Sequence, residues 1–253
     1  MTIDAPSRSD IPALRSLWRE AFGDGEAFLD SFFETAYSPE RCRCVIEDGG
    51  PVAALYWFDC ECRGERVAYI YAVATARAYR GRGLCTALMS DTHRHLVEHG
   101  YSIALLVPGS RELFDFYGKI GYSLCTRIGE IRTTASERGV ELHKIDAKAY
   151  AELRRNLLPN GSVIQENENL SFLSRQMELL AGDGLLLAAS RRGDTLYGAE
   201  LLGDIAAAPA ILKALGCEKG VFRVPGADIP FSMYASLTDK KICPPSYFGF
   251  AFD

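Results

Sequence analysis

A turn rich in glycine and arginine is the part of this sequence best suited to chemistry. Arg80, Gly81, Arg82 and Gly83 follow a strand-like segment and precede a helix-like one that ends near Gly100. A helix that opens at glycines leaves backbone N–H groups unpaired, and its dipole adds partial positive charge at the same place. Two arginines strengthen the attraction for an anion. The turn is therefore predicted to bind a phosphate or a pyrophosphate.

The segments on either side of the turn have the periodicity of buried structure. Tyr69, Tyr71 and Val73 alternate with Ala68, Ile70 and Ala72 in the period-2 pattern of a largely buried strand, so Tyr69 and Tyr71 share one of its faces. These two tyrosines either line a binding pocket or pack in the core. From Leu84 to Leu96, apolar residues recur at helical spacing. The turn thus joins a strand to a helix.

Residues 80–85, Arg-Gly-Arg-Gly-Leu-Cys, resemble motif A of the GNAT acyltransferase superfamily, Arg/Gln-x-x-Gly-x-Gly/Ala. Cys85 stands where the family usually has glycine or alanine. In that family the turn grips the pyrophosphate of coenzyme A, and the preceding strand pairs its backbone with the pantetheine amides. The resemblance therefore implies acetyl-CoA as co-substrate, bound by Ala72, Val73, Ala74, Arg80, Gly81, Arg82, Gly83, Leu84, Cys85 and Thr86.

A second block follows at the spacing expected for the same superfamily. Residues 103–107 form a continuous apolar run, as in a buried central strand. Residues 110–122, SRELFDFYGKIGY, predict a helix whose apolar face carries Leu113, Phe114, Tyr117 and Ile120. This helix resembles motif B, with Ser110 where asparagine is common.

Motif B implies further site residues. Ser110 and Phe114 join the cofactor-binding set, and Tyr117 becomes the candidate catalytic acid, because the matching tyrosine of the family lies near the cofactor sulfur. A phenol with an ordinary pKa of about 10 stays protonated at neutral pH and can donate to a thiolate. The alternative is that Tyr117 is a core residue.

The general base remains open. Some family members carry a glutamate on the motif A strand, but here that strand begins with Arg66, Val67 and Ala68. Glu26, Glu34 and Asp59 are candidates elsewhere in the chain, and solvent is another.

The aromatic end of the chain, residues 244–253, adds one more candidate. Because an exposed apolar tail is unusual, we expect Phe248, Phe250 and Phe252 to pack against the rest of the protein. In relatives of the "intracellular survival" type the terminal carboxylate acts as base. That resemblance extends the role to Asp253 or the chain terminus.

The order of elements predicts two related halves in one α/β protein with mixed sheets. Residues 1–128 follow the helix, helix, strand, strand, strand, helix, strand, helix order of a GNAT domain. Residues 138–253 repeat this plan faintly, with helices over 147–158 and 168–180 and a hairpin over 185–204. The second half lacks the Arg-Gly-Arg-Gly turn and is expected not to hold coenzyme A. The whole resembles, loosely, the tandem GNAT proteins of the survival type.

Composition narrows the class of protein. The chain has 253 residues, 48% of them hydrophobic and 24% charged, as in soluble globular proteins. A net charge of −5 argues against a nucleic-acid partner and favours cationic acceptors such as amines. No apolar run approaches the ~20 residues of a membrane span, and no secretion signal is visible. We therefore expect a cytoplasmic protein without a membrane partner, and leave its oligomeric state open.

A metal site is not expected. The chain has eight cysteines, but Cys42 with Cys44 and Cys60 with Cys62 lie in strand-like segments, where such pairs simply share a face. His95 and His99 lie one helical turn apart with no obvious third ligand, which favours a solvated helix face.

These patterns favour an acetyl-CoA-dependent N-acetyltransferase that transfers an acetyl group directly to an amine of a small molecule or protein. There are two alternative functions. Cys85 and Ser110 allow a non-catalytic sensor that only binds acyl-CoA. A tandem GNAT ligase that uses charged tRNA is disfavoured by the intact turn and by the acidic net charge.

Overall fold

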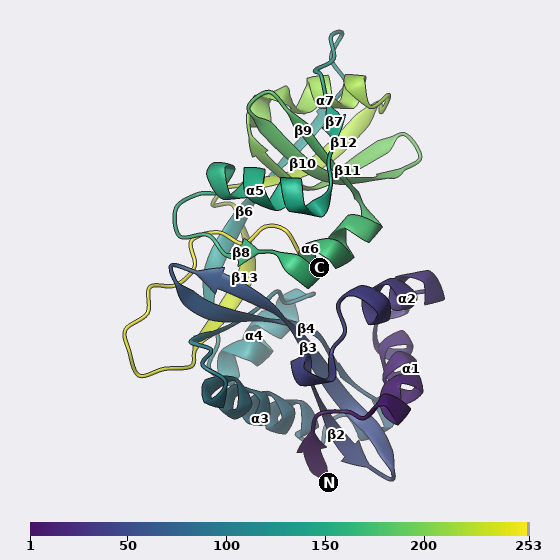
Figure 1. Ribbon diagram of the computed structural model, residues 1–253, viewed down its shortest axis with the longest axis vertical. Coiled ribbons are helices and arrows are strands. Elements are labelled where there is room, and N and C mark those ends of the chain that lie inside the picture. Colours follow the sequence, from purple (N-terminus) through teal and green to yellow (C-terminus); the bar gives the residue numbers. More distant parts are fainter. Residues whose placement is uncertain (252–253) are drawn as a thin grey trace. The chain divides into compact units, whose positions relative to one another are not determined.

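The structure is a computed structural model that describes residues 1–251, and these form two compact units (Figure 1). The first unit contains residues 1–60, 64–106 and 235–242, and the second contains residues 61–63, 107–234 and the segment from Cys243 onward. Both units combine helices with mixed parallel and antiparallel strands, so the predicted α/β class is confirmed.

The first unit is built on five strands in sequential order. They are β1 (Thr2–Asp4), β2 (Cys42–Glu47), β3 (Gly50–Cys62), β4 (Glu65–Thr75) and β5 (Ile103–Leu106). β1, β2 and β3 pair in antiparallel fashion, whereas β4 and β5 are parallel. The parallel pair requires a crossover, which helix α3 (Leu84–Glu98) supplies. The β4–α3 junction is the predicted turn.

Helices α1 (Ile11–Phe22) and α2 (Glu26–Thr35) contribute to an aromatic core. Trp18 of α1 lies 4.6 Å from Phe32 and 5.3 Å from Tyr56, measured between ring centroids. The rings of Tyr69 and Tyr71 join the same cluster, 5.9 Å apart. The two tyrosines therefore pack in the core of this unit.

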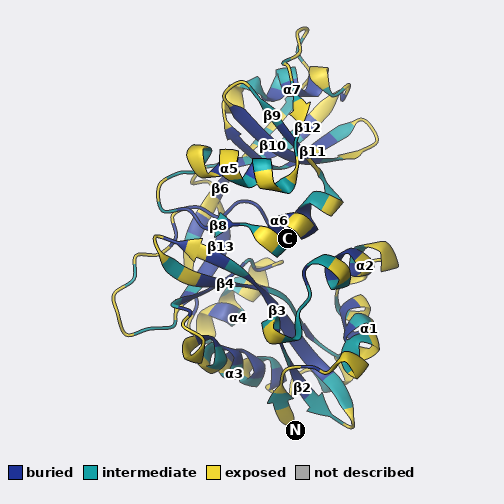
Figure 2. Cartoon of the chain, viewed as in Figure 1, coloured by how far each residue is buried: buried dark blue, intermediate teal, exposed yellow. Residues whose placement is uncertain are grey.

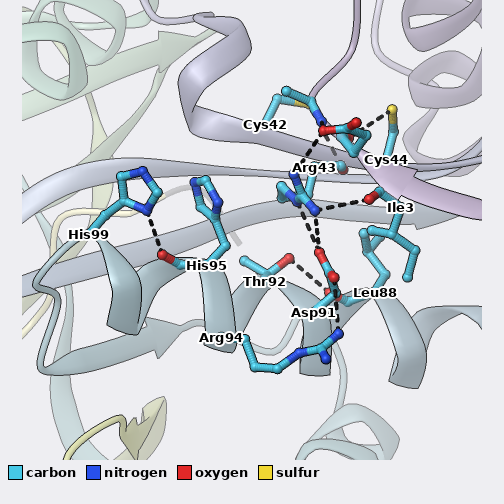
Figure 3. Close-up of polar contacts among 12 residues, drawn as sticks. Ile3, Cys42, Arg43, Cys44, Leu88, Asp91, Thr92, Arg94, His95 and His99 are labelled. Carbon is cyan, nitrogen blue, oxygen red and sulfur yellow. Dashed lines mark hydrogen bonds and ion pairs between the residues drawn. The ribbon is translucent and has the colours of Figure 1, made fainter.

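Helix α3 is fastened to the sheet by one arginine (Figure 3). Arg43 of β2 donates to Asp91 of α3 at 2.5 and 3.0 Å, and to the carbonyl oxygen of Ile3 at 3.0 Å. Both side chains of the ion pair are mostly buried, and hydrogen bonds to charged groups are among the stronger ones in proteins. This ion pair fixes the helix that presents the turn.

His95 and His99 lie near this ion pair, at the end of α3 (Figure 3). The rings of His95 and His99 lie 4.1 Å apart along α3, and Nδ1 of His99 lies 2.7 Å from the carbonyl oxygen of His95 (Figure 3). Within residues 1–251, no three His, Cys, Asp or Glu side chains gather where they could hold a metal ion. None of the eight cysteines, all of which the structure describes, forms a disulfide.

The second unit is built on seven strands in the order β13–β6–β12–β11–β10–β9–β7. Their bounds are Ile229–Ser236, Ser123–Thr134, Lys219–Pro225, Thr195–Gly203, Leu185–Arg192, Glu178–Gly182 and His143–Lys144, respectively. The unit also contains β8 (Ile164–Gln165), α4 (Arg111–Lys119), α5 (Ala147–Leu157), α6 (Asn167–Gln176) and α7 (Ala208–Ala214). Figure 2 shows that the strands are largely buried while the helices expose their outer faces.

The second unit repeats the central motif of the first. β11 and β12 are parallel, and α7 connects them, just as α3 connects β4 and β5. Leu187, Ile211 and Phe222 are fully buried in one cluster that joins α7 to this sheet. Both units therefore contain a parallel strand–helix–strand motif.

One predicted helix is too long. The sequence predicts a helix over residues 168–180, but α6 ends at Gln176 and β9 begins at Glu178. Leu179 and Leu180 pair with Ala188 and Leu187 of β10. Strand pairing across a buried face therefore overrides the helical periodicity of this segment.

The aromatic tail packs as predicted where it is described. Phe248 and Phe250 are fully buried in the second unit. Instead of a regular strand, the segment makes a single β-bridge between Ser162 and Tyr247. Phe252 and Asp253 lie outside the described residues.

No helix within residues 1–251 combines the length and the apolar character that crossing a membrane requires.

Candidate functional site

Strand β4 parts from β5 halfway along its length. The parallel pairing joins Val67 to Ile103 and ends at Tyr69, opposite Leu105, whereas β4 continues to Thr75. Ala72 has φ of 49°, which lies in the left-handed region that residues with a side chain rarely adopt. Residues 70–75 of β4 thus extend beyond their pairing with β5. A backbone edge of this kind can hydrogen-bond an extended ligand.

The turn after β4 has the geometry of an anion site. Gly81 and Gly83 have φ of 76° and 77°, and a Cβ added at either would meet no described atom within 4 Å. Helix α3 begins at Leu84, and no described side chain caps it. The first amide bonded back to the turn is that of Ala87, which donates to Gly83 O. The amides of residues 84–86 are therefore available to an anion.

The two arginines of the turn have different roles. Nε of Arg80 donates to the carbonyl oxygen of Thr75 at 2.9 Å, which ties the turn to the end of β4. Arg82 forms an ion pair with Glu47 at 2.9 Å and lies 5.2 Å from the ring centroid of Tyr79. The charge of Arg82 is therefore partly offset by Glu47. The helix amides carry more of the attraction for an anion than the sequence alone indicated.

The loop that leads into the turn is held by two carboxylates that sequence analysis missed. The hydroxyl of Tyr79 donates to Asp48 at 2.6 Å, and the amide of Arg77 donates to Oε1 of Glu20 at 2.6 Å. The only sequence signal was the position of Asp48 before two glycines. These contacts preorganise the loop before any ligand arrives.

Cys85 replaces the small residue of the motif without adding a reactive group. Burial raises the pKa of its thiol to about 11, even though the N-terminus of a helix favours a thiolate. The thiol is thus neutral at physiological pH. Cys85 acts as a small packing residue next to the turn.

The structure brings together one part of the predicted site. Residues 72–74 and 80–86 all belong to the first unit, on β4, the turn and the start of α3. Ser110, Phe114 and Tyr117 belong to the second unit, where Ser110 is the exposed N-cap of α4 and Phe114 is half-buried.

Tyr117 lies on the buried side of α4. Its side chain is 7% exposed, and its ring centroid lies 5.8 Å from that of Tyr122. Leu113, which the sequence placed on the same apolar face, is 37% exposed.

Two of the candidate bases are engaged by arginines. Glu26 pairs with Arg15 at 2.5 Å, and this hydrogen bond lowers the pKa of the Glu26 carboxyl. Asp59 accepts from Tyr101 and lies 3.5 Å from Arg66. The Glu26 carboxylate is therefore a weaker base. Glu34 is exposed on α2.

Comparison with known proteins gives the same class of fold. Residues 2–125 match a family described as an acetyltransferase (GNAT) domain. N-acetyltransferase Eis of Mycobacterium bovis is 29% identical over 156 residues, which cover 56% of this chain and 37% of that protein. The Eis protein of Mycobacterium tuberculosis matches to the same extent. The chain thus spans little more than a third of the length of these curated relatives.

Solved structures share the fold over nearly the whole chain. A GCN5-related N-acetyltransferase from Anabaena variabilis covers 94% of this chain and 73% of its own, with a TM-score of 0.71 and 18% identity. Eis1 from Mycobacterium abscessus covers 94% and 74%, with a TM-score of 0.68 and 14% identity. Together with the turn and the strand separation, these findings show that residues 2–125 are similar to a GNAT acetyltransferase domain and that the chain shares the fold of GNAT proteins. It is similar to the tandem, Eis-like type.

The state of Cys85 can be tested by alkylation. With a pKa of about 11, the thiol is ionised to about one part in a thousand at pH 8, so its reaction with iodoacetamide should be slow and should rise about tenfold per pH unit. Cys243, which is exposed, serves as the internal comparison. Mass spectrometry of the alkylated peptides gives both rates. Rapid, pH-independent labelling of Cys85 between pH 7 and 9 would contradict the buried neutral thiol.

Proposed function

We propose that this protein is an acetyl-CoA-dependent N-acetyltransferase that acts on an amine of a small molecule or a protein. Residues 1–128 would form the acyltransferase domain, and residues 138–253 a degenerate GNAT-like domain that lacks the phosphate turn. The observation that carries the proposal is the part of β4 beyond its pairing with β5, which leads through the turn into an uncapped helix N-terminus.

The shape of this region suits acetyl-CoA. The backbone of Ala72, Val73 and Ala74 would hydrogen-bond the pantetheine amides, because β4 has left its strand partner before this point. The amides that follow Gly83 would bind the pyrophosphate, and the open space around Gly81 and Gly83 would let it approach the backbone.

The transfer would proceed by direct attack. Acetyl-CoA, when bound, supplies the acetyl thioester. A neutral amine forms the new C–N bond while a backbone N–H of β4 stabilises the negative charge on the carbonyl oxygen. The C–S bond then breaks, the Tyr117 hydroxyl donates its proton to the leaving thiolate, and the amine proton passes to water or to a base. Tyr117 is assigned this role by its match to motif B.

Replacing Gly83 by valine should weaken acetyl-CoA binding at least about tenfold, because a side chain there projects toward the pyrophosphate and strains a left-handed residue. Titration calorimetry measures the affinity. Gly100→Val is a matched control: Gly100 has φ of 78°, has open space around it, and lies at the other end of α3. Equal losses in the two variants would assign the effect to backbone strain, and no binding by the wild type would refute the cofactor assignment.

Tyr117→Phe should lower turnover about 10²–10⁴-fold, the range for loss of a general acid, with little change in acetyl-CoA affinity. A broad panel of amines identifies a substrate on which the assay can be run. Tyr122→Phe is the control, since it removes a hydroxyl from a neighbouring buried tyrosine. Unchanged turnover in Tyr117→Phe would reduce this residue to a packing role. If the wild type binds acetyl-CoA but acetylates no amine, the protein would be an acyl-CoA sensor instead.

A further inference from the structure

The second unit contains its own separation of parallel strands. β11 and β12 pair from Thr195 and Lys219 to Gly198 and Phe222, and there the pairing ends. β11 continues to Gly203 and β12 to Pro225. This opening has the same topology as the one between β4 and β5 in the first unit.

The chain's own C-terminal segment, residues 246–251, bonds to both strands at this opening. The hydroxyl of Tyr247 donates to Glu200 of β11 at 3.2 Å. Nη1 of Arg223 of β12 donates to the carbonyl oxygens of Gly249 and Ala251, each at 2.9 Å. Glu200 and Arg223 both lie just past the last paired residues of their strands, Gly198 and Phe222. The segment therefore lies where the two strands part.

A buried ion pair lies next to the C-terminal segment in this region. Arg154 of α5 donates to the two carboxylate oxygens of Glu200 at 2.6 and 2.9 Å, and Tyr150 donates to Glu200 at 3.1 Å. Glu200 has no exposed surface, and Arg154 is 1% exposed. A buried charge pair is stable only when its remaining polar atoms also find partners. Tyr247 of the segment is one of those partners.

The same network continues along the segment. Arg154 donates to Gln165 at 3.1 Å, and the Gln165 amide donates to the carbonyl oxygen of Phe250 at 2.7 Å. The segment therefore offers carbonyl oxygens and one hydroxyl to charged and amide groups of the second unit, and it buries Phe248 and Phe250 completely.

The sequence of the segment suits this role. A Cβ on Gly249 would lie 2.1 Å from the hydroxyl oxygen of Tyr247 and 2.5 Å from its ring. Only glycine at this position lets the Tyr247 ring fold over the backbone and reach Glu200. The segment thus needs a glycine two positions after Tyr247 in the conformation observed.

We propose that the separation between β11 and β12 is a peptide-binding site, occupied by the chain's own C-terminal segment. Its ligand class is an extended aromatic peptide, recognised by Glu200 through a phenol hydroxyl and by Arg223 through two backbone carbonyls. In the second unit, a segment of protein therefore takes the position that a small-molecule ligand is expected to take between β4 and β5 in the first unit. This inference does not depend on the proposed acetyltransferase activity.

The experiment cuts the connection to the segment after the full chain has folded. A protease site is inserted between Lys240 and Lys241, in an exposed stretch outside the helices and strands. After cleavage, the fragment that begins at Lys241 should remain bound through gel filtration. Excess fluorescent peptide of residues 243–253 should then replace it, while the far-UV circular dichroism of the protein stays unchanged.

Two variants of the cleavable protein make the test specific. Arg223→Met removes both bonds to the segment carbonyls and should speed release of the fragment by at least about tenfold. Lys219→Met is the control, since Lys219 lies on the same strand and, by strand alternation, on the same side as Arg223, but within the paired region. Its release rate should match that of the parent.

Two results would overturn the proposal. If the cleaved fragment leaves at once and the rest stays folded, the separation does not bind peptide. If the rest unfolds as the fragment leaves, the segment is part of the structural core and is not a ligand. Equal release from the Arg223 and Lys219 variants would remove Arg223 from the recognition.

Discussion

Both units depend on one constraint: parallel strands that part leave backbone N–H and C=O groups that need partners. In the first unit, β4 leaves β5 after Tyr69 and runs on to Thr75. In the second unit, β11 and β12 part after Gly198 and Phe222, and the C-terminal segment bonds there to the side chains of Glu200 and Arg223. A shared architectural device thus produces a region suited to a small molecule in one unit and to a peptide in the other.

The electrostatics of the first unit favour an anion through backbone rather than side-chain charge. Arg82 is paired with Glu47, and Arg80 is used to bind the end of β4. The amides at the start of α3 are fixed in direction by the helix, and Arg43 holds that helix against β1 and β2 through Asp91 and Ile3. A preorganised set of amides loses little entropy on binding and tolerates the partial neutralisation of the arginines.

Sequence analysis predicted those features of the fold and the turn that local patterns encode. The glycines of the turn, the periodicity of α1, α3 and β4, and the spacing of the two motifs were sufficient for the fold and for the residues of the turn. It did not find the end of α6 or the exposure of Leu113, because strand pairing and helix docking decide those positions. The left-handed conformation of Ala72 has no local signal either, since alanine rarely adopts it. The Arg154–Glu200 pair joins residues far apart in the chain, and charged residues are ordinarily exposed.

Amide hydrogen exchange with and without acetyl-CoA tests the central claim most directly, because it reads the backbone groups that the strand separation exposes. Acetyl-CoA should slow exchange in residues 70–75 and 81–86, and should leave residues 199–203 and 223–225 of the second unit unchanged. Binding without protection of the β4 edge and the turn, or with protection of residues 199–203 and 223–225, would contradict the account.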